Sequence, residues 1–234
     1  MPESIELVLL PGLDGTGRLF APLIKALALR GIAARAIGYP AHEALDYLEL
    51  ERRVRAELPD TKAFVLLAES FSGPIALRIG AAPPDNMKGL ILSTTFAARP
   101  TSLLGPLAGG VRWARLRPPM FLLELFLLGP WSSPSLRADL ASALAEVPVS
   151  VLSRRAFEAL RVDAVEASLS QMRPAMVLWA RQDRLLSANA RRQLSSANPS
   201  ARMHELDGPH LLLQAQPKVC ADLIAEFVAT VAGE

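Results

Sequence analysis

The sequence has little of several residues that often mark a protein's function. Its 234 residues include one cysteine, Cys220, so no disulfide can form within the chain and a metal site built from cysteines is excluded. Basic residues exceed acidic ones by only two, 25 against 23, and they are scattered along the chain. A nucleic-acid-binding protein usually gathers its Lys and Arg residues on one face. We therefore expect no nucleic-acid partner.

Long hydrophobic runs are absent as well. The most apolar stretch, Phe121–Leu128, contains Glu124 and is far shorter than the roughly 20 residues that a membrane-spanning helix needs, so it predicts a buried or lid helix. The first apolar run, Ile5–Leu10, contains Glu6, lacks a preceding basic region and leads straight into a glycine-rich loop, which is unlike a secretory signal. We expect a cytoplasmic protein with no stable membrane insertion.

The chain does contain a regular alternation of strand-like and helix-like segments. Apolar residues make up 51% of the sequence, enough to bury a sheet on both faces. Helical spacing is found between the strand-like runs, for example at about residues 44–58 and 188–197. This alternation predicts an α/β fold with a mostly parallel sheet of about six strands flanked by helices. The strands are expected at Ile5–Leu10, Ala33–Ile37, Lys62–Ala68, Gly89–Thr95, Ala175–Ala180 and Ala201–Leu206.

The alternation is interrupted once. Between about residues 97 and 171 no convincing strand occurs, and proline-punctuated helical patterns take its place. Helices are expected there at Arg137–Leu144, Ser150–Leu160 and Asp163–Gln171. The interruption predicts a core made of residues 1–96 and 172–234, with a helical lid inserted at residues 97–171.

One junction between a strand and a helix has the character of a nucleophilic serine site. An apolar run ends abruptly at Glu69–Gly73 (Glu-Ser-Phe-Ser-Gly), and helical spacing follows at once. A strand, a tight turn and a helix force the backbone of Ser70 into a strained conformation and present its hydroxyl at the sheet edge. Ala68 and Ser72 stand where the G-x-S-x-G motif has glycines. A serine at this place could instead cap the N-terminus of the helix.

A serine nucleophile needs a base, and the chain has three histidines. His210 follows the last expected strand. Because the carboxyl ends of parallel strands share one edge of a sheet, its loop should open beside Ser70. His204 falls within that strand. His42 lies on the correct edge, but in a loop that should be farther from the serine.

A carboxylate should orient the base. Asp183 follows the fifth expected strand and precedes a helix, where aspartate is also common as a turn or cap residue. Asp207 is a weaker rival, close to His210 in sequence, and Glu69 is expected to point away. Ser70, Asp183 and His210 thus each follow a strand, in the chain order Ser, Asp, His that characterises α/β-hydrolases.

The chain resembles an α/β-hydrolase over nearly its whole length. The residues that carry the resemblance are the loop Pro11–Gly15 (Pro-Gly-Leu-Asp-Gly), the Ser70 turn, the insertion after the fourth strand, and the turns at Asp183 and His210. The position of the lid is similar to that in small bacterial carboxylesterases. The pairing of Leu-Pro-Gly-Leu-Asp-Gly-Thr-Gly with Glu-Ser-Phe-Ser-Gly is also similar to the hydrolase-like part of plant phytyl ester synthases.

Two backbone N–H groups are expected to form an oxyanion hole. The glycine-rich loop lacks the spacing of a phosphate-binding motif, so we expect it to supply one of them. The resemblance assigns this role to Leu13. The second N–H is that of Phe71, at the start of the helix that follows Ser70.

These residues predict a serine esterase that needs no metal or cofactor. It would cleave carboxylic esters with an apolar acyl or alcohol group through an acyl-enzyme, acting on a small-molecule ester or a carrier-bound acyl ester. Met120, Phe121 and Phe126 of the expected lid are candidates for contact with the apolar group, although lid packing alone would also explain them. A thioesterase, lipase or aminopeptidase on the same scaffold stays open, as does a non-catalytic hydrolase-like binding protein.

Overall fold

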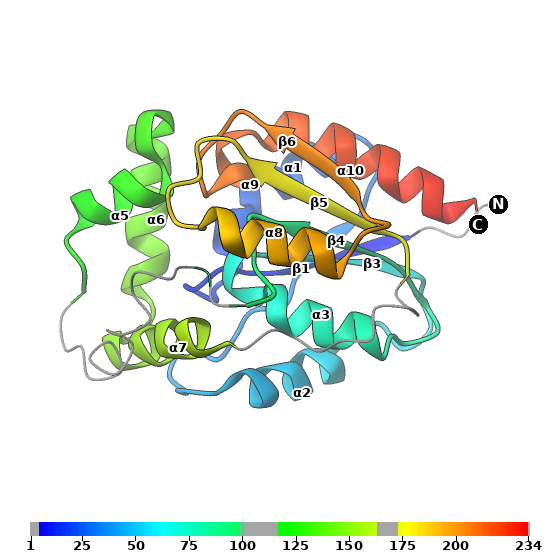
Figure 1. Cartoon of the computed structure of the whole chain (residues 1–234), viewed down its shortest axis with the longest axis horizontal. Coiled ribbons are helices and arrows are strands. Elements are labelled where there is room, and N and C mark those ends of the chain that lie inside the picture. The colour runs from blue at the N-terminus through cyan, green and yellow to red at the C-terminus, as the bar shows by residue number, and fades with distance from the viewer. Residues whose placement is uncertain (1–4, 99, 101–116, 163–172, 234) are drawn as a thin grey trace.

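The structure is a computed structural model that describes residues 5–98, 100, 117–162 and 173–233. In these ranges six strands form one sheet in the order β2-β1-β3-β4-β5-β6, and every neighbouring pair is parallel. The predicted parallel sheet is therefore confirmed (Figure 1). The strands are β1 (Glu6–Leu10), β2 (Ala34–Ala36), β3 (Phe64–Glu69), β4 (Met87–Ser93), β5 (Ala175–Ala180) and β6 (Arg202–Leu206).

Helices cover both faces of the sheet and connect its strands. The sequence did not predict α9, a single helical turn that begins two residues after His210, because four residues are too few for a helical period to be recognised. None of the described helices combines the length and the apolar character that a membrane crossing requires. The helices are α1 (Ala21–Ala28), α2 (Tyr47–Glu57), α3 (Gly73–Ala81), α5 (Met120–Leu127), α6 (Pro134–Ala145), α7 (Val149–Arg161), α8 (Ala188–Ala197), α9 (Leu212–Ala215) and α10 (Pro217–Ala232), with short 3₁₀ helices η1 (Arg18–Phe20), η2 (Ser70–Ser72) and η4 (Gly129–Trp131).

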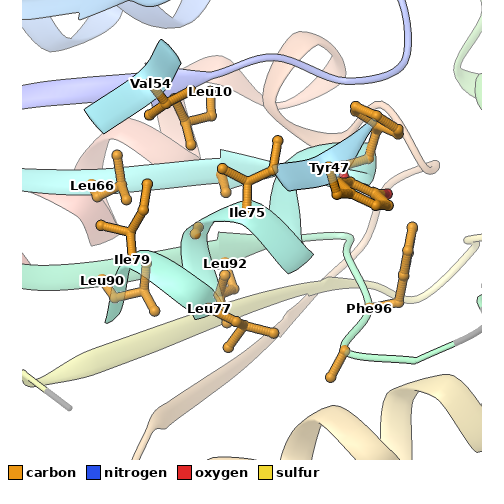
Figure 2. Close-up of a cluster of buried hydrophobic side chains, with 14 of the residues drawn as sticks. Leu10, Tyr47, Val54, Leu66, Ile75, Leu77, Ile79, Leu90, Leu92 and Phe96 are labelled. Atoms are coloured by element: carbon orange, nitrogen blue, oxygen red, sulfur yellow. The ribbon is translucent and has the colours of Figure 1, made fainter. Parts of the chain in front are cut away.

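Each face of the sheet packs against its own group of helices. Successive side chains of a strand point to opposite faces. Val8 and Leu10 of β1 pack with α2, α3 and α8, and Figure 2 shows this cluster, in which α3 contributes Ile75. Leu7 and Leu9 lie on the other face with α1, α9 and α10. Burial on both faces explains why the strands have nearly continuous apolar sequences instead of alternating ones.

Side-chain caps fix where several helices begin. The helix expected at about residue 44 begins at Tyr47, because Asp46 is its N-cap. The Asp46 carboxylate accepts from the Glu49 N–H at 2.9 Å, and the Glu49 carboxylate accepts from the Asp46 N–H at 2.8 Å. This reciprocal pair satisfies two backbone donors that the helix itself cannot. Ser133 and Ser187 cap α6 and α8 with one such hydrogen bond each.

The carboxyl ends of the strands lie at one edge of the sheet, and α5, α6 and α7 lie beyond that edge (Figure 1, left). These helices come between β4 and β5, and the described part of that connection contains no strand. Two hydrogen bonds join α5 to the edge: the Leu127 carbonyl accepts from the Leu211 N–H at 3.0 Å, and the Leu125 carbonyl accepts from the Arg184 guanidinium at 3.2 Å. The helix expected at residues 163–171 lies outside the described residues, and the division into core and lid stays a prediction.

The start of α3 lies very close to the chain that leaves β4. A side-chain carbon on Gly73 would lie 1.9 Å from Thr95 Oγ1 and 2.9 Å from Thr95 Cβ, nearer than atoms can approach. Gly73 has helical backbone angles, φ −54° and ψ −48°, so glycine is needed here for space and not for conformation. Because Thr95 Oγ1 also donates a hydrogen bond to the Ser70 carbonyl, this contact fixes the turn before α3 against the sheet.

We expect Gly73→Ala to destabilise the fold, although alanine is the better helix former. Overpacking of this kind typically lowers the free energy of unfolding by about 1–3 kcal/mol, which is a fall of several degrees in Tm for a chain of this length. Gly233→Ala is the control, since the added carbon would meet nothing closer than 3.7 Å. Thermal unfolding followed by circular dichroism measures both variants. An unchanged Tm for Gly73→Ala would contradict the close approach.

Candidate active site

Ser70 lies in a strained turn at the end of β3. β3 ends at Glu69, and Ser70 has a φ of +49°, a left-handed conformation that residues other than glycine rarely adopt. The surrounding structure holds the turn through its carbonyls. The Ser70 carbonyl accepts a hydrogen bond from Thr95 Oγ1. The next carbonyl, that of Phe71, accepts one from the Tyr47 hydroxyl at 3.0 Å. The serine hydroxyl consequently stands at the carboxyl edge of the sheet.

Three side chains that follow three different strands form one chain of hydrogen bonds. Ser70 Oγ lies 2.8 Å from His210 Nε2, and His210 Nδ1 lies 2.9 Å from Asp183 Oδ2. An ionised carboxylate can only accept, so Asp183 fixes the proton of His210 on Nδ1 and leaves Nε2 as the acceptor for the serine hydroxyl. The side chains of His210 and Asp183 are 1% and 2% exposed, whereas Ser70 is partly exposed. The structure thus brings together the three residues that the sequence singled out.

Asp183 serves its own turn and His210 at the same time. Its Oδ1 accepts from two backbone N–H groups of the following residues, at 2.8 and 3.1 Å, as aspartate commonly does between a strand and a helix. Its Oδ2 remains for the imidazole. Gln182 connects this turn to the His210 loop through two hydrogen bonds. Its N–H donates to the Gly208 carbonyl at 3.0 Å, and its side-chain oxygen accepts from the Gly208 N–H.

Burial and charge act in opposite directions on the pKa values of this pair. Burial favours the neutral form of Asp183, but the charge and hydrogen bond of His210 and the two backbone N–H groups outweigh it and hold the pKa of Asp183 below its ordinary value of 3.8. Burial lowers the pKa of His210, but the charge and hydrogen bond of Asp183, together with the charge of Glu69, raise it above 6.5. The imidazole is therefore a stronger base than a free histidine.

Glu69 is a second carboxyl group beside the site, 1% exposed at the end of β3. Its Oε2 accepts from the Gln214 amide at 3.2 Å, and its Oε1 has no hydrogen-bond partner in the described part of the chain. Burial raises the pKa of Glu69 from 4.5 to about 7, and the Gln214 bond and the charge of His210 lower it only in part. No hydrogen bond joins Glu69 to His210 among the residues described, so this carboxyl group acts on the imidazole through its charge.

The glycine-rich loop after β1 lies against the Ser70 turn. A carbon added to Gly12 would lie 4.0 Å from Ser70 Cβ. The Gly12 carbonyl accepts from the Gly15 N–H at 3.0 Å. Because the carbonyl and the N–H of one trans peptide point in opposite directions, the Leu13 N–H points away from that bond. It donates no hydrogen bond within the described residues. The Phe71 N–H lies in the first turn of η2, where helices leave backbone donors unpaired.

Ser72 gives a physical reason for one departure from the G-x-S-x-G motif. Its buried hydroxyl donates to the Pro11 carbonyl and shares a second hydrogen bond with the Tyr39 hydroxyl. Glycine at this position could form neither bond. The serine therefore ties the glycine-rich loop to the turn that carries Ser70.

The alternative residues weighed from the sequence lie apart from this hydrogen-bond chain. His42 is exposed, and His204 is partly exposed on β6. The exposed Asp207 carboxylate accepts from the Arg181 guanidinium at 2.7 Å, and the Nδ1 of His210 is held by Asp183. Across the described residues, no three His, Cys, Asp or Glu side chains are grouped as a metal ion would require.

The three candidate substrate contacts all lie on α5, which has no buried residue. Met120 packs against a small apolar cluster that includes Leu19 and Leu140. Phe121 and Phe126 are 66% and 45% exposed. The segment is therefore a helix, as expected, but it is not buried. Its contact with substrate stays a prediction.

Two residues beside the site were not found from the sequence. Arg155 of α7 is 1% exposed and donates to backbone carbonyls of the glycine-rich loop. A signal was available, because Arg155 stands four residues from both Val151 and Ala159, which are buried, and an arginine on the apolar side of a helix is unusual. Gln214, the partner of Glu69, lies in the single-turn helix α9, which has no sequence pattern of its own.

Comparison with known proteins finds a matching family model and similar solved structures. A family model described as alpha/beta hydrolase family matches residues 7–223. A carboxylesterase structure from the ammonia-oxidizing thaumarchaeon Nitrososphaera gargenis is 15% identical, with a TM-score of 0.82 over 100% of this chain and 93% of that one. A thermophilic esterase from Thermogutta terrifontis is 17% identical, with a TM-score of 0.80 over 99% and 92%. The enol-lactonase from Burkholderia xenovorans LB400 is 16% identical, with a TM-score of 0.79 over 99% and 92%.

At these identities the solved structures share a fold with this chain, and fold alone does not define an activity. A search of curated protein sequences gives no significant match. The family model, in contrast, spans all six strands of the sheet and the helices between β4 and β5. The chain therefore belongs to the alpha/beta hydrolase family.

Proposed function

We propose that the chain is a serine hydrolase that cleaves carboxylic esters through an acyl-enzyme. The observation that carries the proposal is the continuous hydrogen-bond chain from Ser70 through His210 to Asp183. It begins at a partly exposed hydroxyl and ends at a buried carboxylate, so His210 can take the proton of a serine nucleophile while Asp183 orients the imidazole. The Leu13 N–H, unpaired in the described structure, lies on the loop beside this hydroxyl and supports the same reading.

In the first half of the reaction, Ser70 Oγ attacks the ester carbonyl carbon while His210 Nε2 takes the hydroxyl proton. The Asp183 carboxylate stabilises the imidazolium that forms. The N–H groups of Leu13 and Phe71 bind the carbonyl oxygen as it becomes negatively charged, and each such donor is typically worth ~10²–10³ in rate. When the tetrahedral intermediate collapses, the bond to the alcohol oxygen breaks and His210 gives its proton to the departing alkoxide.

In the second half, a water molecule repeats the sequence on the acyl-enzyme. His210 takes a proton from the water, whose oxygen attacks the acyl carbonyl, and the same two N–H groups bind the oxyanion. The bond to Ser70 Oγ then breaks, His210 returns the proton to the serine, and the carboxylic acid leaves. Every step uses groups of the chain itself, so the mechanism asks for no metal or cofactor.

An ester with an apolar acyl or alcohol group fits this site best. α5 exposes Phe121 and Phe126, and its hydrogen bonds to Leu211 and Arg184 hold it next to the turns that carry His210 and Asp183. An apolar chain lying there would gain about 25 cal/mol for each Å² of apolar surface removed from water. The substrate is then a small-molecule ester or an acyl ester carried by a protein. The carboxylesterase and esterase names of two similar structures agree with this class.

We expect Ser70→Ala to abolish ester hydrolysis. Loss of a serine nucleophile lowers kcat by roughly 10⁴- to 10⁶-fold. The assay is hydrolysis of nitrophenyl esters from acetate to palmitate, and Ser196→Ala, which changes an exposed serine on α8, is the matched control. Turnover of no ester by the wild type, or equal turnover by Ser70→Ala, would exclude the proposal. Nitrophenyl thioesters measured in parallel distinguish a thioesterase.

We expect Asp183→Asn to lower kcat by about 10⁴-fold, because an amide that donates to Nδ1 forces the wrong tautomer on His210. Asp207→Asn should leave kcat near the wild-type value, since that carboxylate is exposed and pairs with Arg181. Each variant removes one negative charge, and the two loops are neighbours. A loss of kcat in Asp183→Asn alone would therefore come from the orientation of His210 and not from the change in net charge. Equal losses in the two variants would argue against this assignment.

We expect kcat/KM to fall in acid as His210 gains a proton, because an imidazolium cannot accept one from Ser70. The midpoint of that fall should lie above 6.5, since the pKa of His210 is raised. Glu69 contributes to the raised pKa through its charge, so Glu69→Gln should move the midpoint to lower pH. Glu205→Gln, at an exposed carboxylate, should leave the midpoint in place. A midpoint that is the same in the wild type and in Glu69→Gln would rule out this coupling.

A further inference from the structure

Arg155 is a buried cation that binds backbone carbonyls instead of a substrate or an exposed acid. Its Nη1 donates to the Leu13 carbonyl at 3.1 Å and to the Asp14 carbonyl at 2.7 Å. Its Nη2 donates to the Pro40 carbonyl at 3.0 Å, and its Cζ lies 5.6 Å from the centre of the Tyr39 ring. Taking a guanidinium out of water has a desolvation penalty that such bonds must offset. An apolar side chain would fill the same space without that penalty, but it would leave the three carbonyls without this donor. Packing alone therefore does not account for an arginine here.

The loop that Arg155 binds is held at every carbonyl. Within Pro11–Gly15, each of the five successive carbonyls accepts a hydrogen bond, whereas the Leu13 N–H donates none in the described structure. Arg155 accounts for two of the five. Taking the carbonyls in order from Pro11 to Gly15, the donors are Ser72 Oγ, the Gly15 N–H, Arg155 Nη1, Arg155 Nη1 again and the Tyr39 N–H.

The loop and the guanidinium also fit each other sterically. Gly15 has a φ of +71°, and a side-chain carbon there would lie 2.3 Å from Arg155 Nη1. Glycine at this position lets the backbone come directly against the guanidinium. The Asp14 carboxylate meanwhile accepts through Oδ2 from the Thr16 N–H and hydroxyl, at 2.8 and 2.6 Å, and so stabilises the turn. Burial lowers the pKa of the Arg155 guanidinium, and the negative charge of Asp14, which favours the charged guanidinium and raises that pKa, offsets this only in part.

We propose that Arg155 is a positioning residue for ester hydrolysis: its guanidinium fixes the Leu13 and Asp14 carbonyls and thereby keeps the Leu13 N–H aimed at the oxyanion. The inference rests on the proposed function. Arg155 forms hydrogen bonds with the loop. It therefore acts on the reaction through the position of the Leu13 N–H. The helix that carries it, α7, lies in the connection between β4 and β5, and Arg155 is more than 140 residues further along the chain than Leu13 and Asp14. An oxyanion donor acts in the transition state, so the effect belongs to kcat.

The test compares substitutions at two neighbouring arginines of α7. Arg155→Lys keeps the charge but loses the planar fork that reaches several carbonyls, and Arg155→Met keeps an apolar stem of similar length. Arg154→Lys and Arg154→Met are the matched controls, because Arg154 pairs with Glu158 on the same helix at 2.9 Å. kcat and KM for a nitrophenyl ester are measured per active site, with sites counted by titration with a nitrophenyl phosphonate, well below the Tm of each variant.

We expect both Arg155 variants to lose about 10- to 10²-fold in kcat, the usual effect of a small misplacement of catalytic groups, with little change in KM. The Arg154 variants should keep the wild-type kcat. A merely structural role would lower the number of active sites and leave kcat per site unchanged, and that result would overturn the inference. A change in KM alone would overturn it as well.

Hydrogen exchange of the peptide covering residues 11–17 separates this inference from the proposed function. Arg155→Met should speed exchange there and leave the protection of β3 and β4 unchanged, whether or not the wild type hydrolyses esters. Unchanged exchange in residues 11–17 would overturn the inference even in an active esterase. If the wild type cleaves no ester, the proposed function fails, and faster exchange still supports the anchoring of the loop by Arg155.

Discussion

The left-handed backbone of Ser70 is the constraint on which the rest of the site depends. A non-glycine residue in this region costs of order 1–3 kcal/mol and persists only where its surroundings leave it no alternative. Here the absence of a side chain at Gly73 brings α3 against Thr95, and Thr95 in turn binds the Ser70 carbonyl. Tyr47 holds the next carbonyl and stacks on Phe71 with ring centres 4.8 Å apart. The Ser70 hydroxyl is therefore aimed by the packing of α2, α3 and β4, and not by its own loop.

Two carboxyl groups act on His210, and their surroundings shift their pKa values in opposite directions. Asp183 accepts three hydrogen bonds, which keep its pKa below the ordinary value in spite of burial. Glu69 accepts one, and burial raises its pKa to about 7. His210 thus lies near one carboxylate that its hydrogen bonds hold in the charged form and one carboxyl group whose burial favours the neutral form. Environment separates their roles, as it does for pairs of acids in many active sites.

The sheet, its order along the chain and the turn at Ser70 could be predicted, because strands buried on both faces leave apolar runs and sharp ends in the sequence. Asp183 and His210 followed from topology, since parallel strands deliver the residues after them to one edge. Arg155 could not be assigned a role in this way. Its partners Leu13 and Asp14 lie more than 140 residues away, and no local pattern specifies such a contact. Composition likewise left α5 undecided between a buried helix and a lid helix, and in the structure none of its residues is buried and three, Phe121, Leu125 and Phe126, are exposed.

The hydrogen bonds between α7 and the glycine-rich loop limit how this protein could be rebuilt. In a fold whose helical connections differ between members, the stretch between β4 and β5 would be the natural part to graft from a relative in order to change substrate preference. In this chain that stretch also supplies the donor to the Leu13 and Asp14 carbonyls. A graft that omitted Arg155 would leave these two carbonyls without the donor that holds them here. On the proposed roles of α5 and Arg155, selectivity and rate would be inherited together, and a successful chimaera would have to carry an arginine at the same place.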